Sequence, residues 1–175
     1  MSNNSNLNSS RLGRAAGSKE VFSPKGTLRP TNEYLTEVSD SEGDYCIIRC
    51  ALPAGAVVPL HSHSDRETFY LLSGELDALR GDQWEKLGPG GVFDVRNGIK
   101  HAWRNSSQAT ASMICVTTAK MARFLQNSSV AAEDSAPEEQ AERFLKLVNA
   151  NGYWLAGPEE NAAVGLDVSW SERHD

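Results

Sequence analysis

Between residues 20 and 119, short runs of alternating apolar and polar positions are interrupted by Gly, Pro, Asn or Asp roughly every eight to twelve residues. An alternation of period two is typical of strands with one buried face, and this spacing of turns is typical of a β-sandwich or barrel. The expected strands cover residues 45–51, 67–72, 75–80, 83–87, 92–95, 101–105 and 111–118. The pattern therefore predicts an all-β, antiparallel domain.

Beyond residue 118 the apolar positions change to helical spacing. They fall at Met121, Phe124 and Leu125, and then at Ala141, Phe144, Leu145 and Val148. The first ten residues hold four Ser and four Asn, which predicts a disordered tail rather than a secretory signal. We expect an N-terminal tail over 1–19, a barrel over 20–119, a helical extension over 120–152 that packs on the barrel or on a partner chain, and a C-terminal tail over 153–175.

Composition narrows the class of partner. The net charge is -6, from 17 Lys plus Arg against 23 Asp plus Glu, which argues against binding to nucleic acid or to an anionic membrane. The apolar runs are far shorter than the roughly 18 residues that span a bilayer. Three cysteines are too few for a disulfide framework. These features predict a soluble, cytoplasmic protein whose partner is a small molecule.

Three of the four histidines lie in the β region, beside turn residues. His61 and His63 are two residues apart, so an extended chain presents both imidazoles on one face. Glu67 begins the next expected strand, which we expect to lie adjacent to that of His61, about 4.8 Å away, so that its carboxylate can reach the same point. His101 follows a later turn. Neutral imidazoles with a carboxylate suit Fe, Mn, Ni, Cu or Zn. The alternative is a set of ordinary surface or core histidines.

The glycines around these residues make the pattern more specific. They give Gly55-(x)5-His61-x-His63-(x)3-Glu67-(x)6-Gly74, followed by Gly90-(x)7-Gly98-(x)2-His101-(x)3-Asn105. Over residues 55–105 the chain resembles a single-domain cupin of the quercetin dioxygenase-like group. The resemblance implies a jelly-roll barrel, one divalent metal ion per chain held by His61, His63, Glu67 and His101, and a homodimer.

The second motif departs from the cupin pattern at one position, where Arg96 replaces the usual proline. Arg96 is either a solvated turn residue or a contact for an anionic ligand at the barrel mouth. Side-chain alternation extends the predicted site, because Phe69 and Leu71 share the face of Glu67 and Trp103 shares that of His101. These three residues either line an apolar ligand pocket or simply fill the barrel.

Three functions remain open. The resemblance favours a metal-dependent oxidoreductase, a dioxygenase acting on a flavonol-like or diketone-like enol, in which Glu67 is both a metal ligand and the catalytic base. The second is a non-redox isomerase, cyclase, lyase or decarboxylase that uses the ion as a Lewis acid. The third is a non-catalytic module that binds a small molecule.

Overall fold

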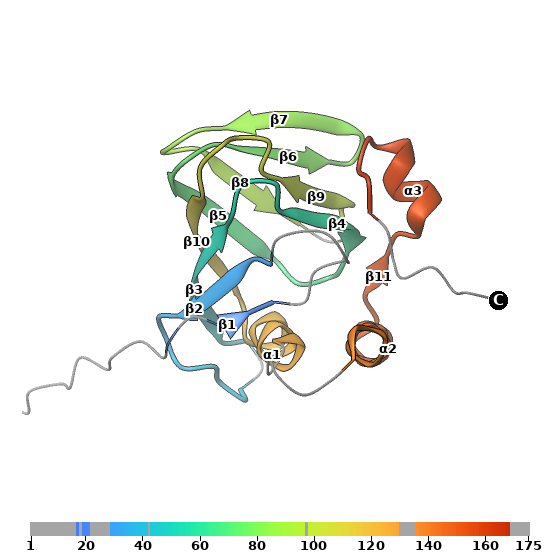
Figure 1. Ribbon diagram of the computed structural model, residues 1–175. Coiled ribbons are helices and arrows are strands. Elements are labelled where there is room, and N and C mark those ends of the chain that lie inside the picture. Colours follow the sequence, from blue (N-terminus) through green and yellow to red (C-terminus); the bar gives the residue numbers. More distant parts are fainter. Residues whose placement is uncertain are drawn as a thin grey trace, which may run out of the picture.

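The computed structural model describes residues 17, 19–21, 29–41, 43–96, 98–129 and 136–168, and consists of two facing antiparallel sheets with helices at one end (Figure 1). The six-stranded sheet contains, in spatial order, β1 (Lys19–Glu20), β2 (Thr31–Tyr34), β3 (Tyr45–Leu52), β10 (Ala111–Thr118), β5 (Glu67–Ser73) and β8 (Val92–Val95). The five-stranded sheet contains β11 (Trp154–Leu155), β4 (Val57–Ser62), β9 (His101–Arg104), β6 (Leu76–Arg80) and β7 (Gln83–Leu87). The predicted all-β jelly-roll architecture is confirmed. The predicted N-terminal tail lies almost entirely outside the described residues.

The predicted alternation places the core between the two sheets. Phe69 and Leu71 on β5 are buried with Glu67, and Trp103 on β9 is buried with His101. The Trp103 ring lies 4.9 Å from the ring of Phe69, measured between centroids, and makes an edge contact with it. This interior is therefore closely packed, except where the site opens toward the helices.

The structure explains why two positions of the motifs are glycine. At Gly74 the backbone has φ +80°, and an added Cβ would lie 2.7 Å from Ala111 Cα at the start of β10, so only glycine fits there. Gly98 has φ +71°, and its N–H donates to the carbonyl of His63 at 2.8 Å. The second motif therefore fixes the backbone of a residue in the first.

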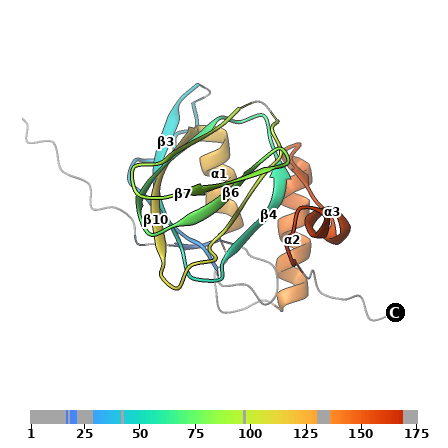
Figure 2. The same ribbon diagram turned by 90° about the horizontal axis from the view of Figure 1, so that it is seen from above.

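Helices α1 (Ala119–Ser128) and α2 (Pro137–Ala150) follow β10, as the change of period predicts. Viewed along the barrel, α1 lies across its open end and α2 lies to one side (Figure 2). Thr118 caps α1 by accepting a hydrogen bond from Met121 N–H at 3.1 Å. The Phe124 ring of α1 packs against Phe144 of α2 and against Tyr153. The helical extension therefore packs on the barrel of its own chain.

The expectation of a tail from residue 153 is wrong for the residues that the structure describes. Residues 153–168 contain β11, an edge strand of the five-stranded sheet, and a short helix, α3 (Pro158–Ala163), and residues 156–168 cover the outer face of that sheet. Asn161 fixes this segment, because its Oδ1 accepts a hydrogen bond from Leu60 N–H at 2.9 Å. Leu166 and Val168 complete the apolar contact. A two-residue strand and a six-residue helix are too short to leave a recognisable period in the sequence.

The outer face of the six-stranded sheet is not covered in the same way. Tyr70, Leu72, Val92 and Val116, on β5, β8 and β10, are all exposed. Tyr70 pairs with Val92 on one side and with Ile114 on the other, so these side chains form a continuous apolar surface. No helix in the described part of the chain is long and apolar enough to cross a membrane.

Candidate metal centre

The three motif histidines meet on the inner side of the five-stranded sheet. His61 on β4 is the direct strand partner of His101 on β9, and their ring centroids are 4.0 Å apart. His63 follows the end of β4, and its ring lies 5.0 Å from that of His101. One nitrogen from each of the three rings lies within 4.8 Å of the other two. The sequence prediction that these residues converge is therefore confirmed.

Backbone carbonyl groups orient all three imidazoles in the same way. The Nδ1 atoms of His61, His63 and His101 lie 2.8, 3.0 and 2.9 Å from the carbonyl oxygens of Pro59, Asp65 and Ile99. Because a carbonyl only accepts, each Nδ1 carries the proton and each Nε2 has a free lone pair. The Nε2 atoms of His63 and His101 are buried without a hydrogen-bond partner.

Glu67 approaches from the opposite sheet. We expected its carboxylate on a strand adjacent to that of His61, but β4 and β5 belong to different sheets, and the turn at residues 64–66 crosses between them. Glu67 Oε2 lies 3.2 Å from His63 Nε2 and 3.6 Å from His101 Nε2. It does not belong to the compact set formed by the three imidazoles. The carboxylate therefore lies at the edge of the histidine cluster, beside two of its members.

Burial and mutual contact shift the pKa of three groups in this cluster. Burial and the neighbouring imidazoles of His101 and His63 lower the pKa of His61 well below its ordinary value. Burial by itself raises the pKa of Glu67, but contacts with His101 and His63 outweigh it and hold this pKa well below the usual range. Burial likewise opposes a charged His63, but the Glu67 carboxylate outweighs it and raises the pKa of His63.

These residues fit a transition-metal ion. A carboxylate oxygen and an imidazole lone pair at 3.2 Å are both acceptors, so a proton or a cation has to lie between them. Imidazole nitrogens and a carboxylate are ligands that divalent first-row metals accept. His61, His63 and His101 would hold such an ion, and Glu67 would need only a small side-chain movement to join them.

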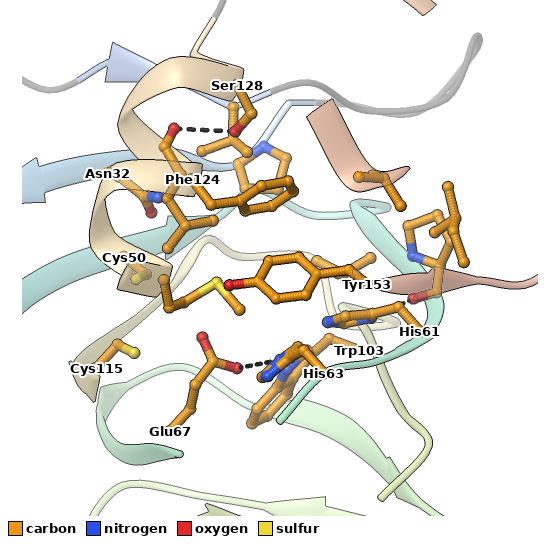
Figure 3. Close-up of a pocket in the computed structure, with 18 of the residues that line it drawn as sticks. Asn32, Cys50, His61, His63, Glu67, Trp103, Cys115, Phe124, Ser128 and Tyr153 are labelled. Carbon is orange, nitrogen blue, oxygen red and sulfur yellow. Dashed lines mark hydrogen bonds and ion pairs between the residues drawn. The ribbon is translucent and has the colours of Figure 1, made fainter. Parts of the chain in front are cut away.

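A cavity of about 150 Å³ opens on this cluster (Figure 3). Its walls are mainly apolar, and they include Phe69, Trp103, Met113, Met121, Phe124 and Tyr153. Of the predicted pocket residues, Phe69 and Trp103 lie in this wall, whereas Leu71 lies in the barrel core. Arg96 lies outside the cavity, where its Nε donates to Asp94 Oδ2 at 2.6 Å. This position agrees with the solvated turn that the sequence left open and gives no support to a ligand contact.

Sequence reasoning missed a polar cluster that supports His63. Asp65, whose carbonyl oxygen accepts from His63 Nδ1, is buried, and its Oδ2 accepts a hydrogen bond from the Tyr153 hydroxyl at 2.6 Å. Its Oδ1 accepts a hydrogen bond from Thr118, and Lys120 Nζ lies 3.8 Å from its Oδ2. Burial and the Asp65 carboxylate raise the pKa of Tyr153, so its hydroxyl keeps its proton. The C-terminal segment therefore helps to fix the loop that orients a metal ligand.

We expect Tyr153→Phe to lower the affinity for metal about 10-fold, within the range found when an outer-shell partner of a metal ligand is removed. The change removes the hydrogen bond to Asp65 and leaves the ring contacts with Phe124 and His63. Competition with a chromophoric chelator measures the affinity. Tyr70→Phe is the matched control, because Tyr70 is exposed on the outer face of the six-stranded sheet. Equal affinities in Tyr153→Phe and wild type would show that the Asp65 contact does not support the metal site.

Comparison with known proteins identifies the domain. The family model for the cupin domain matches residues 48–117. No curated protein matches the chain. Among solved structures, a predicted oxalate decarboxylase from Thermotoga maritima has a TM-score of 0.52 at 20% identity, and the match covers 58% of this chain and 90% of that one. The polyketide cyclase RemF from Streptomyces resistomycificus has a TM-score of 0.53 at 18% identity, covering 75% and 92% of the two chains.

At these identities the two structures support the fold and carry no argument about activity. The family match includes His61, His63, Glu67 and His101, the four residues that the barrel brings together. With both motifs, the barrel and the family model in agreement, the chain contains a cupin domain, which the family model matches over residues 48–117.

Proposed function

We propose that the protein is a metal-dependent enzyme that removes a proton from a small enolisable compound, with dioxygen-dependent cleavage as the first activity to test. The observation that carries this proposal is the placement of Glu67, an ionised carboxylate at the edge of the histidine cluster, on the wall of a mainly apolar cavity. A divalent ion held by His61, His63 and His101 would supply Lewis-acid activation of the substrate oxygen and, if redox-active, a place for dioxygen.

Glu67 is placed where a base would act on a substrate bound at the ion. Its carboxylate contacts only two of the three imidazoles, so it can accept a proton while the histidines keep the ion. The cavity wall has no Lys or Arg among its described residues, so no fixed positive charge competes for the carboxylate there. Glu67 would then take the proton from a substrate hydroxyl that approaches the ion.

The size of the cavity limits the substrate. Its volume of about 150 Å³ equals that of an engineered protein cavity that holds one benzene molecule. A one-ring enol or a short diketone therefore fits inside, whereas a three-ring flavonol would extend beyond this volume. The absence of Lys and Arg from the described wall also disfavours substrates with several negative charges. The flavonol part of the sequence-based prediction is thus the weaker part.

Turnover with and without air separates the candidate functions. The protein is purified without added metal or chelator, its metal content is measured, and oxygen uptake is followed with one-ring enols and β-diketones. A dioxygenase consumes one dioxygen per substrate and is silent under anaerobic conditions. Equal product formation without oxygen would establish the Lewis-acid alternative, an isomerase, cyclase, lyase or decarboxylase. Saturable binding with no product would establish a binding module. Zn²⁺ has no redox chemistry, so a zinc-only protein would also argue against the dioxygenase.

The homodimer implied by the cupin resemblance stays a prediction. We propose the outer face of the six-stranded sheet as its interface, because residues 156–168 already cover the outer face of the five-stranded sheet. Tyr70→Lys is expected to convert the dimer to a monomer, because it places a charge in the middle of the apolar surface. Light scattering after size-exclusion chromatography measures the mass, and Lys86→Glu on β7 is the charge-changing control. A wild-type monomer, or a dimer that survives Tyr70→Lys, would exclude this interface.

A further inference from the structure

The cavity has a second polar region, away from the histidines. Asn32 lies on β2, three strands from β5 in the six-stranded sheet, and its side chain lines the cavity although only 4% of the residue is exposed. Figure 3 shows Asn32 and Ser128 on the side of Phe124, whereas Glu67 and His63 lie on the other side of the Tyr153 ring. The two ends of the cavity are therefore both polar, and the wall between them is apolar.

A buried hydroxyl beside Asn32 has no hydrogen-bond partner. Tyr34, two residues further along β2, is 6% exposed, and its hydroxyl makes no hydrogen bond with the described residues. The side chains of Asn32 and Ser129 lie close enough to this hydroxyl to lower its pKa against the effect of burial, but neither reaches it in hydrogen-bond geometry. Buried hydroxyls are nearly always satisfied by protein, water or ligand. Tyr34 does not line the cavity itself, but its unsatisfied hydroxyl lies beside Asn32, which does, and it therefore points to a water or a ligand group that reaches both through the cavity.

The residues around Asn32 define the chemistry of the ligand group that would bind there. Pro30, Leu52, Phe124 and Leu125 form the nearby wall, so the Asn32 amide offers hydrogen bonds in an otherwise apolar environment. An amide and a phenol both donate and accept. With no Lys or Arg in the described wall, a neutral hydroxyl or carbonyl matches this end better than a carboxylate or phosphate.

We infer that Asn32, with the Tyr34 hydroxyl, is a polar anchor for a neutral hydrogen-bonding group at the end of the ligand opposite the oxygen that faces the histidine cluster. The contact is direct or runs through one ordered water. The inference rests on the proposed function, and it narrows the substrate to one-ring enols or short diketones that carry a second hydroxyl or carbonyl. Asn32 is then a specificity-determining residue.

Two matched probes test the anchor. Kojic acid and allomaltol are one-ring hydroxypyranones that share the same chelating oxygens, and they differ only in a hydroxymethyl or a methyl group at the far side of the ring. Their affinities are measured by calorimetry with the zinc-loaded protein, in which no oxidation occurs. Metal content is determined before and after, so that removal of zinc by the probe is not mistaken for binding.

Wild type is expected to bind kojic acid about 2- to 10-fold more tightly than allomaltol, the effect of one neutral hydrogen bond. Asn32→Leu, which keeps the side-chain size, should bring the ratio close to one while the affinity for allomaltol changes little. Tyr34→Phe is expected to reduce the ratio partly, and it keeps the test valid if Asn32→Leu folds poorly. Asn149→Leu, at an exposed position of α2, is the control.

The outcomes separate the anchor from the proposed function. A ratio near one in wild type, or the same ratio in wild type and in both variants, overturns the anchor and leaves ordered water as the partner of Asn32. If neither probe binds zinc-loaded wild type, the proposed function fails for one-ring enols, and the anchor fails with it.

Discussion

Replacing His101 by Ala is expected to lower the affinity for metal by at least about 100-fold, the upper limit for loss of a mere outer-shell partner. His101 is fully buried, and its Nε2 is one of the three lone pairs that face each other inside the barrel. At a free metal concentration 100-fold above Kd, binding stabilises the wild-type fold by about 2.7 kcal/mol. For a chain of this size, that corresponds to a rise in Tm of roughly 5–10 °C.

The variant should show neither the bound metal nor the rise in Tm. Elemental analysis and thermal melts with and without added metal measure both effects. Because His101→Ala leaves a cavity in a packed interior, the metal-free melt has to stay cooperative for the comparison to hold, and His61→Ala, at a partly exposed position, is the second variant. His174→Ala is the matched control, since it removes the histidine that belongs to neither motif. Stoichiometric metal in both His101→Ala and His61→Ala would show that the histidine cluster is not the metal site, and the proposed catalysis would be refuted with it.

Two of the four candidate ligands could be placed from the sequence because their geometry is local. Two residues that are i and i+2 on an extended chain face the same side whatever the rest of the fold does, and this fixes His61 and His63 relative to each other. The same alternation placed Phe69 and Trp103 inside the barrel. His101 and Glu67 required the family resemblance, since they come from other strands and their approach depends on how the sheets close.

What the sequence did not predict depends on contacts between distant segments. Tyr153 reaches Asp65 across 88 residues, and no pattern around Tyr153 distinguishes it from an ordinary core tyrosine. Asn32 begins no recognisable motif, and its role follows only from the cavity that β2 and α1 share. The assignment of Glu67 to a strand adjacent to His61 was wrong for a related reason, because the period of two says which way a side chain points and not which sheet the strand joins.

The part of the site outside the family match is the part that shapes the cavity. The cupin match ends at residue 117, whereas Met121 and Phe124 of α1 and Tyr153 beyond α2 complete the wall. The barrel therefore supplies the histidine cluster and Glu67, and the extension supplies much of the remaining cavity wall. This division explains why the motifs predict the convergence of the three histidines and do not predict a substrate.

Glu67→Gln is expected to reduce kcat by about 10²- to 10⁴-fold, the usual contribution of a general base, while the protein retains metal. The amide keeps the shape of the side chain and one carbonyl oxygen, but it cannot accept a proton from the substrate. His61, His63 and His101 still supply three ligands, so the loss has to be expressed as turnover per bound metal ion.

Glu75→Gln, at an exposed position between β5 and β6, is the matched control. If Glu67→Gln turns over at the wild-type rate per metal ion, Glu67 is only a ligand and the base has to be sought elsewhere.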